Sequence, residues 1–282
     1  GAWIAVTQPL TWVGYAALVL TVGAINGIGI GTAHELGHKK ETLDRWLSKI
    51  ALAPSAYGHF FVEHNRGHHK RVATPEDPAS ARMGESFWAF LPRSVWGSLQ
   101  SAWALEQERL NKQGMKVWHF QNHNLQAWGL TLVLFGALVA WLGWMALPFL
   151  LLQAVYAASM LEVVNYVEHY GLLRQRDATG RYVRCEPEHS WNSNHLVGNL
   201  LLYQLQRHSD HHAHPSRRYQ ALRHFESAPQ LPAGYATMIT VAYLPPLWFV
   251  WMDRRVMAHY RGDLGLVNVQ ASARRRLMQR WG

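Results

Sequence analysis

The sequence predicts an all-α protein embedded in a membrane, and three observations support this fold class. Long apolar runs occur at residues 10–33 and 125–166, and one crossing of a bilayer needs ~20 such residues. Charged residues make up 16% of the chain, against ~25% in a typical soluble domain. Tryptophan occurs 14 times, and aromatic side chains favour membrane interfaces. We therefore expect one membrane-embedded helical domain over residues 1–282.

The first apolar run, residues 10–33, is uncharged and long enough to form a transmembrane helix. Lys39 and Lys40 follow it, which indicates that this end faces the cytoplasm. Residues 46–62 are also apolar, but they are too few for a crossing and contain Pro54. We expect this segment to be re-entrant or interfacial.

The second long run, residues 125–166, has Gly143 and Pro148 near its middle and suits a two-helix transmembrane hairpin. A hairpin starts and ends on one side of the membrane. Residues 170–282 are therefore expected to be mainly cytoplasmic and interfacial. The sequence begins without a methionine, and we expect the natural protein to extend further toward its N-terminus, with additional spans.

The formal net charge is +9, and the single cysteine, Cys185, excludes an intrachain disulfide framework. In a membrane protein, a basic excess is typical of cytoplasmic loops, and it also suits a docking surface for an acidic protein. We expect no nucleic-acid partner.

Nine histidines fall into four tight groups, each at the edge of an apolar stretch. Neutral imidazole is the commonest metal ligand among side chains, and one transition metal binds roughly four to six ligands. Nine imidazoles are too many for one ion and suit two. The predicted metal ligands are His34, His38, His64, His68, His69, His169, His208, His211 and His212.

Two pairs of adjacent histidines, His68-His69 and His211-His212, add a geometric argument. Neighbouring residues on a helix point ~100° apart. Each pair therefore serves two different metal ions more naturally than one. By contrast, His119 and His123 have helical spacing but no companions, and we expect them not to bind metal.

Two other metal chemistries must be weighed. The segment His34–His38 matches the H-E-x-x-H zinc metalloprotease motif, with Glu35 as the base, but such a site needs only one or two further ligands. A carboxylate-bridged di-iron bundle needs two E-x-x-H motifs on helices. Its second motif, Glu186–His189, contains Pro187 and lies in a polar segment.

Polar side chains next to the clusters are candidates to orient the imidazoles, although each also suits an ordinary solvated or salt-bridged role. These predicted second-layer residues are Glu35, Glu63, Asp77, Asn165, Glu168 and Asp210.

Four motifs resemble those of the integral-membrane alkane monooxygenases: His34–Lys40, Glu63–Ser80, Asn165–Leu172 and Leu205–His212. The resemblance runs from about residue 10 to about residue 260. The short His-x-x-His-His pattern is shared with membrane fatty-acid desaturases and sterol-type hydroxylases. The family has about six spans, whereas three are found here.

The resemblance implies a non-haem centre of two iron ions bound by the nine histidines, with O2 as oxidant. It implies electrons from rubredoxin, which an NADH–rubredoxin reductase reduces, and a location in the bacterial inner membrane with the site facing the cytoplasm. The expected reaction is terminal hydroxylation of a medium-chain n-alkane to a primary alcohol. We assign no catalytic residue beyond the metal ligands.

The alternatives left open are a fatty-acyl desaturase or hydroxylase at the same type of centre, a membrane zinc protease, and a non-enzymatic metal carrier. Rubredoxin is usually acidic, and Arg217, Arg218 and Arg223 follow the last histidine cluster. We therefore expect these arginines to form its docking site.

Overall fold

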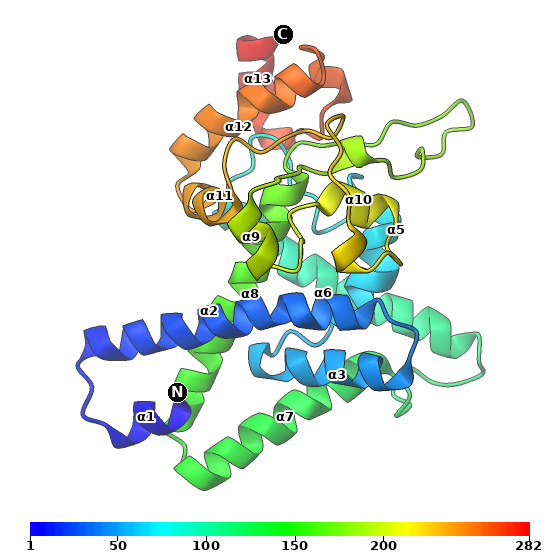
Figure 1. Cartoon of the computed structure of the whole chain (residues 1–282). Coiled ribbons are helices and arrows are strands. Elements are labelled where there is room, and N and C mark those ends of the chain that lie inside the picture. Colours follow the sequence, from blue (N-terminus) through cyan, green and yellow to red (C-terminus); the bar gives the residue numbers. More distant parts are fainter. The chain divides into compact units, whose positions relative to one another are not determined.

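The computed structural model describes residues 1–282 and consists of helices joined by turns, without β-strands (Figure 1). The predicted all-α class is confirmed. The chain divides into two compact units. The first unit comprises Gly1–Arg66 and Ser98–Leu161, and the second comprises Gly67–Gly97 and Glu162–Gly282.

Three helices are long and apolar enough to cross a membrane: α2 (Trp12–Gly37), α7 (His123–Leu142) and α8 (Ala146–His169). All three have most or all of their length in the first unit. Gly143, with a φ of 84°, separates α7 from α8 and provides the backbone conformation for the turn. The chain is an integral membrane protein by this criterion.

The other elements of the first unit are shorter. They are α1 (Ala2–Thr7), α3 (Thr42–Leu52), η1 (Ala53–Ser55), α4 (Phe60–Val62) and the C-terminal part of α6 (Phe87–Asn111). The π-helix η2 (Glu63–His68) begins in this unit and ends in the second.

Helices α2 and α8 approach each other closely because glycines line their contact. A Cβ atom added at Gly23 would lie 2.8 Å from the carbonyl oxygen of Gln153, and one added at Gly27 would lie 2.8 Å from Cβ of Met160. Asn26 Nδ2 also donates to Gln153 Oε1 at 2.7 Å. Small residues and interhelical hydrogen bonds are typical of helix packing inside membranes.

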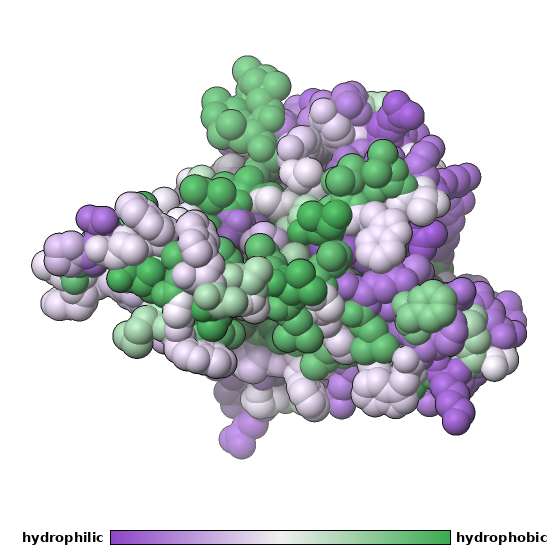
Figure 2. All heavy atoms as spheres, turned by 90° about the horizontal axis from the view of Figure 1, so that it is seen from below, coloured by the Kyte–Doolittle hydropathy of each residue, from purple (hydrophilic) through white to green (hydrophobic).

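Helix α3 exposes apolar side chains and buries polar ones. Its exposed side chains include Leu43, Leu47 and Ile50, whereas Ser48 and Lys49 are buried. An apolar outer face and a polar inner face suit a helix that contacts lipid. Large exposed hydrophobic side chains also occur on α2, α7 and α8, and hydrophobic residues gather on the face seen in Figure 2.

The second unit surrounds a core rich in aromatic side chains, which include Tyr166, Tyr170, Trp191, Tyr235 and Trp248. Its elements are α5 (His69–Arg71), the first part of α6, the end of α8, η3 (Pro187–His189), α9 (Leu196–Leu201), α10 (His208–Ala213), η4 (Tyr219–Ala221), α11 (Tyr235–Ala242), α12 (Pro245–His259), η5 (Leu264–Leu266), η6 (Ala271–Ala273) and α13 (Arg274–Trp281). This core supports the end of α8, which carries His169.

Candidate metal centre

In the first unit, three of the predicted ligands lie together. His34 and His38 are four residues apart at the end of α2, so their rings share one face of the helix. Nε2 of His38 lies 3.1 Å from Nε2 of His64. The ring of His34 lies 4.4 Å from that of His64, and Phe60 stacks on His64 at 4.7 Å.

His64 belongs to the π-helix η2, in which backbone hydrogen bonds span one residue more than in an α-helix. The side chain of Asn65 donates to the carbonyl oxygen of Phe61 at 2.8 Å and satisfies that acceptor at the start of the π-turn. Such π-helical segments are frequent at functional sites.

In the second unit, His68, His169, His208 and His212 form a buried cluster whose candidate ligand atoms all lie within 4.8 Å of one another. Nε2 of His212 lies 2.8 Å from Nε2 of His208 and 3.2 Å from Nε2 of His68. The ring of His169 lies about 5 Å from each of the other three rings.

This cluster fits a transition-metal ion. Two ligands at ~2.1 Å from a metal and at right angles are ~3 Å apart, which matches the separations between the Nε2 atoms. Neither ring nitrogen of His169 has a hydrogen-bond partner, although the side chain is buried. Burial lowers the pKa of His212 well below its usual value and keeps the ring neutral. Neutral imidazole is the form that binds metal.

The two remaining predicted ligands, His69 and His211, pair with each other in the second unit. Their Nε2 atoms are 3.1 Å apart. The rings of His68 and His69 are inclined by 71°, so adjacent histidines present their nitrogens in different directions. Nε2 of His69 contacts Nε2 of His211, whereas Nε2 of His68 contacts Nε2 of His212.

Asp77 holds His68 in one orientation. Oδ2 of Asp77 accepts from Nδ1 of His68 at 2.9 Å and from the hydroxyl of Ser80 at 2.6 Å. The Ser80 hydroxyl oxygen accepts in turn from the backbone N–H of Ala73 at 2.8 Å. Burial alone would raise the pKa of Asp77, but His68 and Ser80 lower it to about 2. The ionised carboxylate only accepts, so the proton of His68 resides on Nδ1 and its Nε2 remains available to a metal.

Glu168 contacts His208 in the same cluster. Oε2 of Glu168 lies 3.0 Å from Nε2 of His208, and Oε1 accepts from the hydroxyl of Tyr235 at 2.5 Å. Tyr235 is buried on α11. Sequence reasoning assigned no role to Tyr235 or to Ser80. Tyr235 lies far from Glu168 in the sequence, and Ser80 was noted only as the last residue of the Glu63–Ser80 motif.

The other predicted second-layer residues have different partners. Glu35 pairs with Lys39, and Asn165 Nδ2 donates to Glu162 Oε1 at 3.5 Å. Asp210 is buried and binds His214, Arg217 and Arg223. None of these partners is among the nine clustered histidines. Glu63 is buried beside His64 in the sequence.

The three arginines predicted to dock a partner differ in their surroundings. Arg217 pairs with Asp210 through both carboxylate oxygens, and Arg223 binds the same carboxylate through its backbone N–H at 2.8 Å. Arg218 is exposed. The side chain of Arg223 is also 54% exposed, although its guanidinium lies 3.5 Å from Asp210, so Arg218 is the exposed member that does not pair with this carboxylate.

The first unit also contains an apolar cavity of about 740 Å³ at the α7–α8 turn. Its lining includes Phe135, Val139, Leu147 and Leu151. None of the nine histidines lines this cavity, so it is separate from the clusters.

Comparisons with known proteins agree with the motifs. Residues 10–242 match the model of the fatty acid desaturase family. The alkane 1-monooxygenase of Acinetobacter baylyi is 53% identical over 265 residues, which cover 94% of this chain and 65% of that protein. Alkane 1-monooxygenase 1 of Alcanivorax borkumensis is 49% identical over 281 residues, which cover 100% of this chain and 70% of that protein.

A more distant relative is the xylene/toluene monooxygenase hydroxylase component of Pseudomonas putida, which is 28% identical over 251 residues. The chain spans 65% of the length of the Acinetobacter protein and 70% of that of the Alcanivorax protein. The nine-histidine motifs, the apolar helices and these similarities together identify the chain as a member of the fatty acid desaturase family, within its alkane 1-monooxygenase branch.

Proposed function

We propose that the protein hydroxylates the terminal methyl group of medium-chain n-alkanes to give primary alcohols, using O2 and electrons from rubredoxin. The observation that carries the proposal is the ligand set of nine clustered histidines, seven of which are buried and two partly buried. Relatives about 50% identical are named alkane 1-monooxygenases. The proposed location is the bacterial inner membrane, with the site facing the cytoplasm.

The proposed cofactor is a pair of iron ions held by the nine histidines. Bound iron would supply the reduction of O2 that is needed to attack an unactivated C–H bond. Asp77 keeps His68 in the tautomer whose Nε2 can bind metal. Tyr235 holds Glu168 beside Nε2 of His208, the nitrogen that also faces His212. The protein itself orients these ligands and keeps most of them away from water, since seven of the nine are buried and His38 and His69 are partly buried.

The proposed substrate has no polar group, so apolar surroundings must select it. An alkane dissolves in the bilayer that the apolar helices would cross. A substrate that enters from the lipid reaches the protein without passing through water, which explains why such chemistry takes place at a membrane.

The second candidate function is desaturation or hydroxylation of a fatty-acyl chain. It is favoured by the family model, which is named for fatty acid desaturases. The two candidates use the same type of centre and differ in their substrate and product.

Product analysis separates the candidates. The protein would be reconstituted in nanodiscs with rubredoxin, its reductase, NADH and ¹⁸O2, and supplied with n-octane or a fatty-acyl substrate. We expect 1-octanol carrying ¹⁸O. An alkene product would refute hydroxylation, and one zinc per chain with peptidase activity would favour a metalloprotease. Reversible metal uptake without O2 consumption would favour a metal carrier.

A pair of histidine variants provides a matched control. His169→Gln removes a buried cluster histidine, whereas His119→Gln alters a histidine in a loop of the first unit. We expect the first variant to lose both iron and product, and the second to keep both. Equal iron content in the two variants would contradict the proposed ligand role of His169.

The proposed electron donor is rubredoxin, docked beside Arg217, Arg218 and Arg223. Attraction between opposite charges accelerates encounter and weakens with salt. We expect turnover at limiting rubredoxin to fall as ionic strength rises from ~10 mM, where the Debye length is ~30 Å, to ~1 M, where it is ~3 Å. A salt-independent rate would remove the docking proposal.

A further inference from the structure

The loop that joins α6 to α7 in the first unit displays two aromatic side chains. Trp118 and Phe120 are 72% and 74% exposed. Lys116 is also exposed, whereas Val117 and His119, which alternate with these residues, are less exposed. This part of the loop consists of turns, in which the backbone N–H of His119 donates to the carbonyl oxygen of Lys116 at 3.0 Å. Lys116, Trp118 and Phe120 are its exposed residues, and we call them the aromatic loop face.

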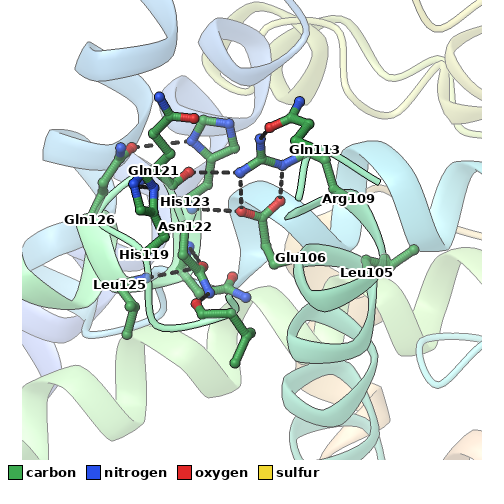
Figure 3. Close-up of polar contacts among 12 residues, drawn as sticks. Leu105, Glu106, Arg109, Gln113, His119, Gln121, Asn122, His123, Leu125 and Gln126 are labelled. Atoms are coloured by element: carbon green, nitrogen blue, oxygen red, sulfur yellow. Dashed lines mark hydrogen bonds and ion pairs between the residues drawn. The ribbon is translucent and has the colours of Figure 1, made fainter. Parts of the chain in front are cut away.

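Hydrogen bonds hold the backbone of this loop in place, and Figure 3 shows the contacts of Arg109, Gln121 and Asn122 that contribute to this. Arg109 Nη2 donates to the carbonyl oxygen of Gln121 at 2.7 Å, and Gln126 Nε2 donates to that of Phe120 at 3.0 Å. Asn122 Nδ2 donates to the carbonyl oxygen of Val117 at 2.8 Å. The rings are thus exposed on an ordered loop, and their exposure is not the result of a loose chain.

Glu106 ties this loop to the first turn of α7. Its carboxylate is buried, accepts from Arg109 Nε at 2.8 Å and accepts from the backbone N–H of His123 at 2.7 Å. Asn122 caps the same helix by accepting from the backbone N–H of Asn124 at 2.8 Å. A carboxylate and a cap at a helix N-terminus stabilise it through the helix dipole. The loop and the start of α7 therefore form one ordered unit.

The position of α7 places the aromatic loop face beside the membrane surface. α7 is one of the three helices apolar enough to span a membrane, and it begins at His123. If α7 crosses the bilayer, the membrane surface lies at its first turn, three residues after Phe120. Trp118 also contacts Trp103 at 4.9 Å, and Trp103 stacks on Trp128 of α7 at 6.0 Å, so aromatic rings continue from the loop onto the helix.

We propose that Lys116, Trp118 and Phe120 insert into the lipid headgroup layer and anchor the start of α7 at the membrane surface. Tryptophan rings gather at the boundary between headgroups and acyl chains, and a lysine beside them suits lipid phosphate. A water-soluble partner would dock on a surface that stands clear of the membrane, whereas this face adjoins the start of a span. The proposal depends on α7 as a span and is independent of the hydroxylation activity.

Nitroxide labels at single cysteines test the anchor. In a Cys185→Ser background, Trp118→Cys and Phe120→Cys would be labelled in nanodiscs, and their accessibility to O2 compared with that to a water-soluble nickel chelate. Two control positions give the accessibility ratios expected for a lipid-facing and a water-facing label. Leu132→Cys lies on α7 and is 72% exposed, whereas Ala178→Cys lies in an exposed polar turn of the second unit.

We expect the O2-to-nickel ratio at positions 118 and 120 to be several-fold above that at 178 and below that at 132. A ratio equal to that at 178 would overturn the proposal. So would labels that are water-accessible in nanodiscs and become immobilised only when an acidic electron-carrier protein is added. Metal content and a monodisperse elution profile would verify folding. If Trp118→Cys fails this check because it loses the contact with Trp103, the label at 120 decides alone.

Discussion

Replacing Glu106 by glutamine tests whether a buried carboxylate holds the start of α7. Glu106 binds Arg66 and Arg109 and accepts from the backbone N–H of His123. Burial would raise its pKa, but the hydrogen bonds from Arg109 and from the His123 backbone lower it to about 2. A fall from 4.5 to about 2 corresponds to roughly 3 kcal/mol of stability.

The actual stabilisation is smaller, because the arginine side chains that bind Glu106 are partly exposed to water. Arg66 is 35% and Arg109 is 22% exposed, so solvent screens part of the attraction. We expect Glu106→Gln to lose about 2 kcal/mol, or roughly 5 °C in the midpoint of thermal unfolding in detergent. Glu108→Gln is the matched control on the same helix, because Glu108 pairs with Lys112 while both side chains are largely exposed. The control should change by less than about 1 kcal/mol.

The pH dependence gives an independent check. Because the folded state lowers the pKa of Glu106, its stabilising effect is fully present above pH 4.5 and is lost as pH falls toward 2. The difference in unfolding midpoint between the wild-type protein and Glu106→Gln should therefore shrink between pH 4.5 and the lowest pH that the protein tolerates. Equal losses in the two variants, or a difference that stays constant from pH 7 to pH 3, would refute the reasoning.

Three further predictions follow from contacts described above. Tyr235→Phe should lower iron affinity by about tenfold, measured as iron per chain after dialysis against a chelator, because Glu168 loses a hydrogen bond. The control Tyr182→Phe, at a half-buried tyrosine whose hydroxyl contacts Arg176 and none of the clustered histidines, should not. Gly23→Ala should lower the free energy of unfolding by about 1–3 kcal/mol. Gly29→Ala should not, because a Cβ added at Gly29 has no atom within 4 Å. Similar midpoints of thermal unfolding for the two variants would contradict close α2–α8 packing. Arg218→Glu should raise the KM for rubredoxin more than it lowers the maximal rate, and an unchanged KM would exclude this arginine from docking.

The sequence predicted those parts of the protein that depend on local spacing. His34 and His38 share a helix face because they are four residues apart, and the α7–α8 turn occurs at Gly143, near the middle of a run too long for one span. Tyr235 was not predicted, because its contact with Glu168 arises only when α11 packs into the same core as the end of α8.

Helix α3 illustrates a second limit of sequence reasoning. The apolar run was expected to begin at residue 46, whereas the helix begins at Thr42. Counting apolar residues missed its first turn because that turn contains Asp44 and Arg45. The sequence analysis also did not predict which face of this helix is buried, and the structure places Lys49 on the inside.

Because Glu63–His68 is a π-helix, the directions of the candidate ligands on and after it depend on the number of residues in this segment. A π-turn holds one residue more than an α-turn, so deletion of a single residue would let the helix relax to regular α geometry. That relaxation would improve the local backbone hydrogen bonds while rotating His68 and His69 by ~100° about the helix axis. Exchange of a side chain here alters one contact, whereas a one-residue deletion misdirects two candidate ligands at once. The number of residues between His64 and His68 therefore matters to the candidate metal centre as much as the imidazoles themselves.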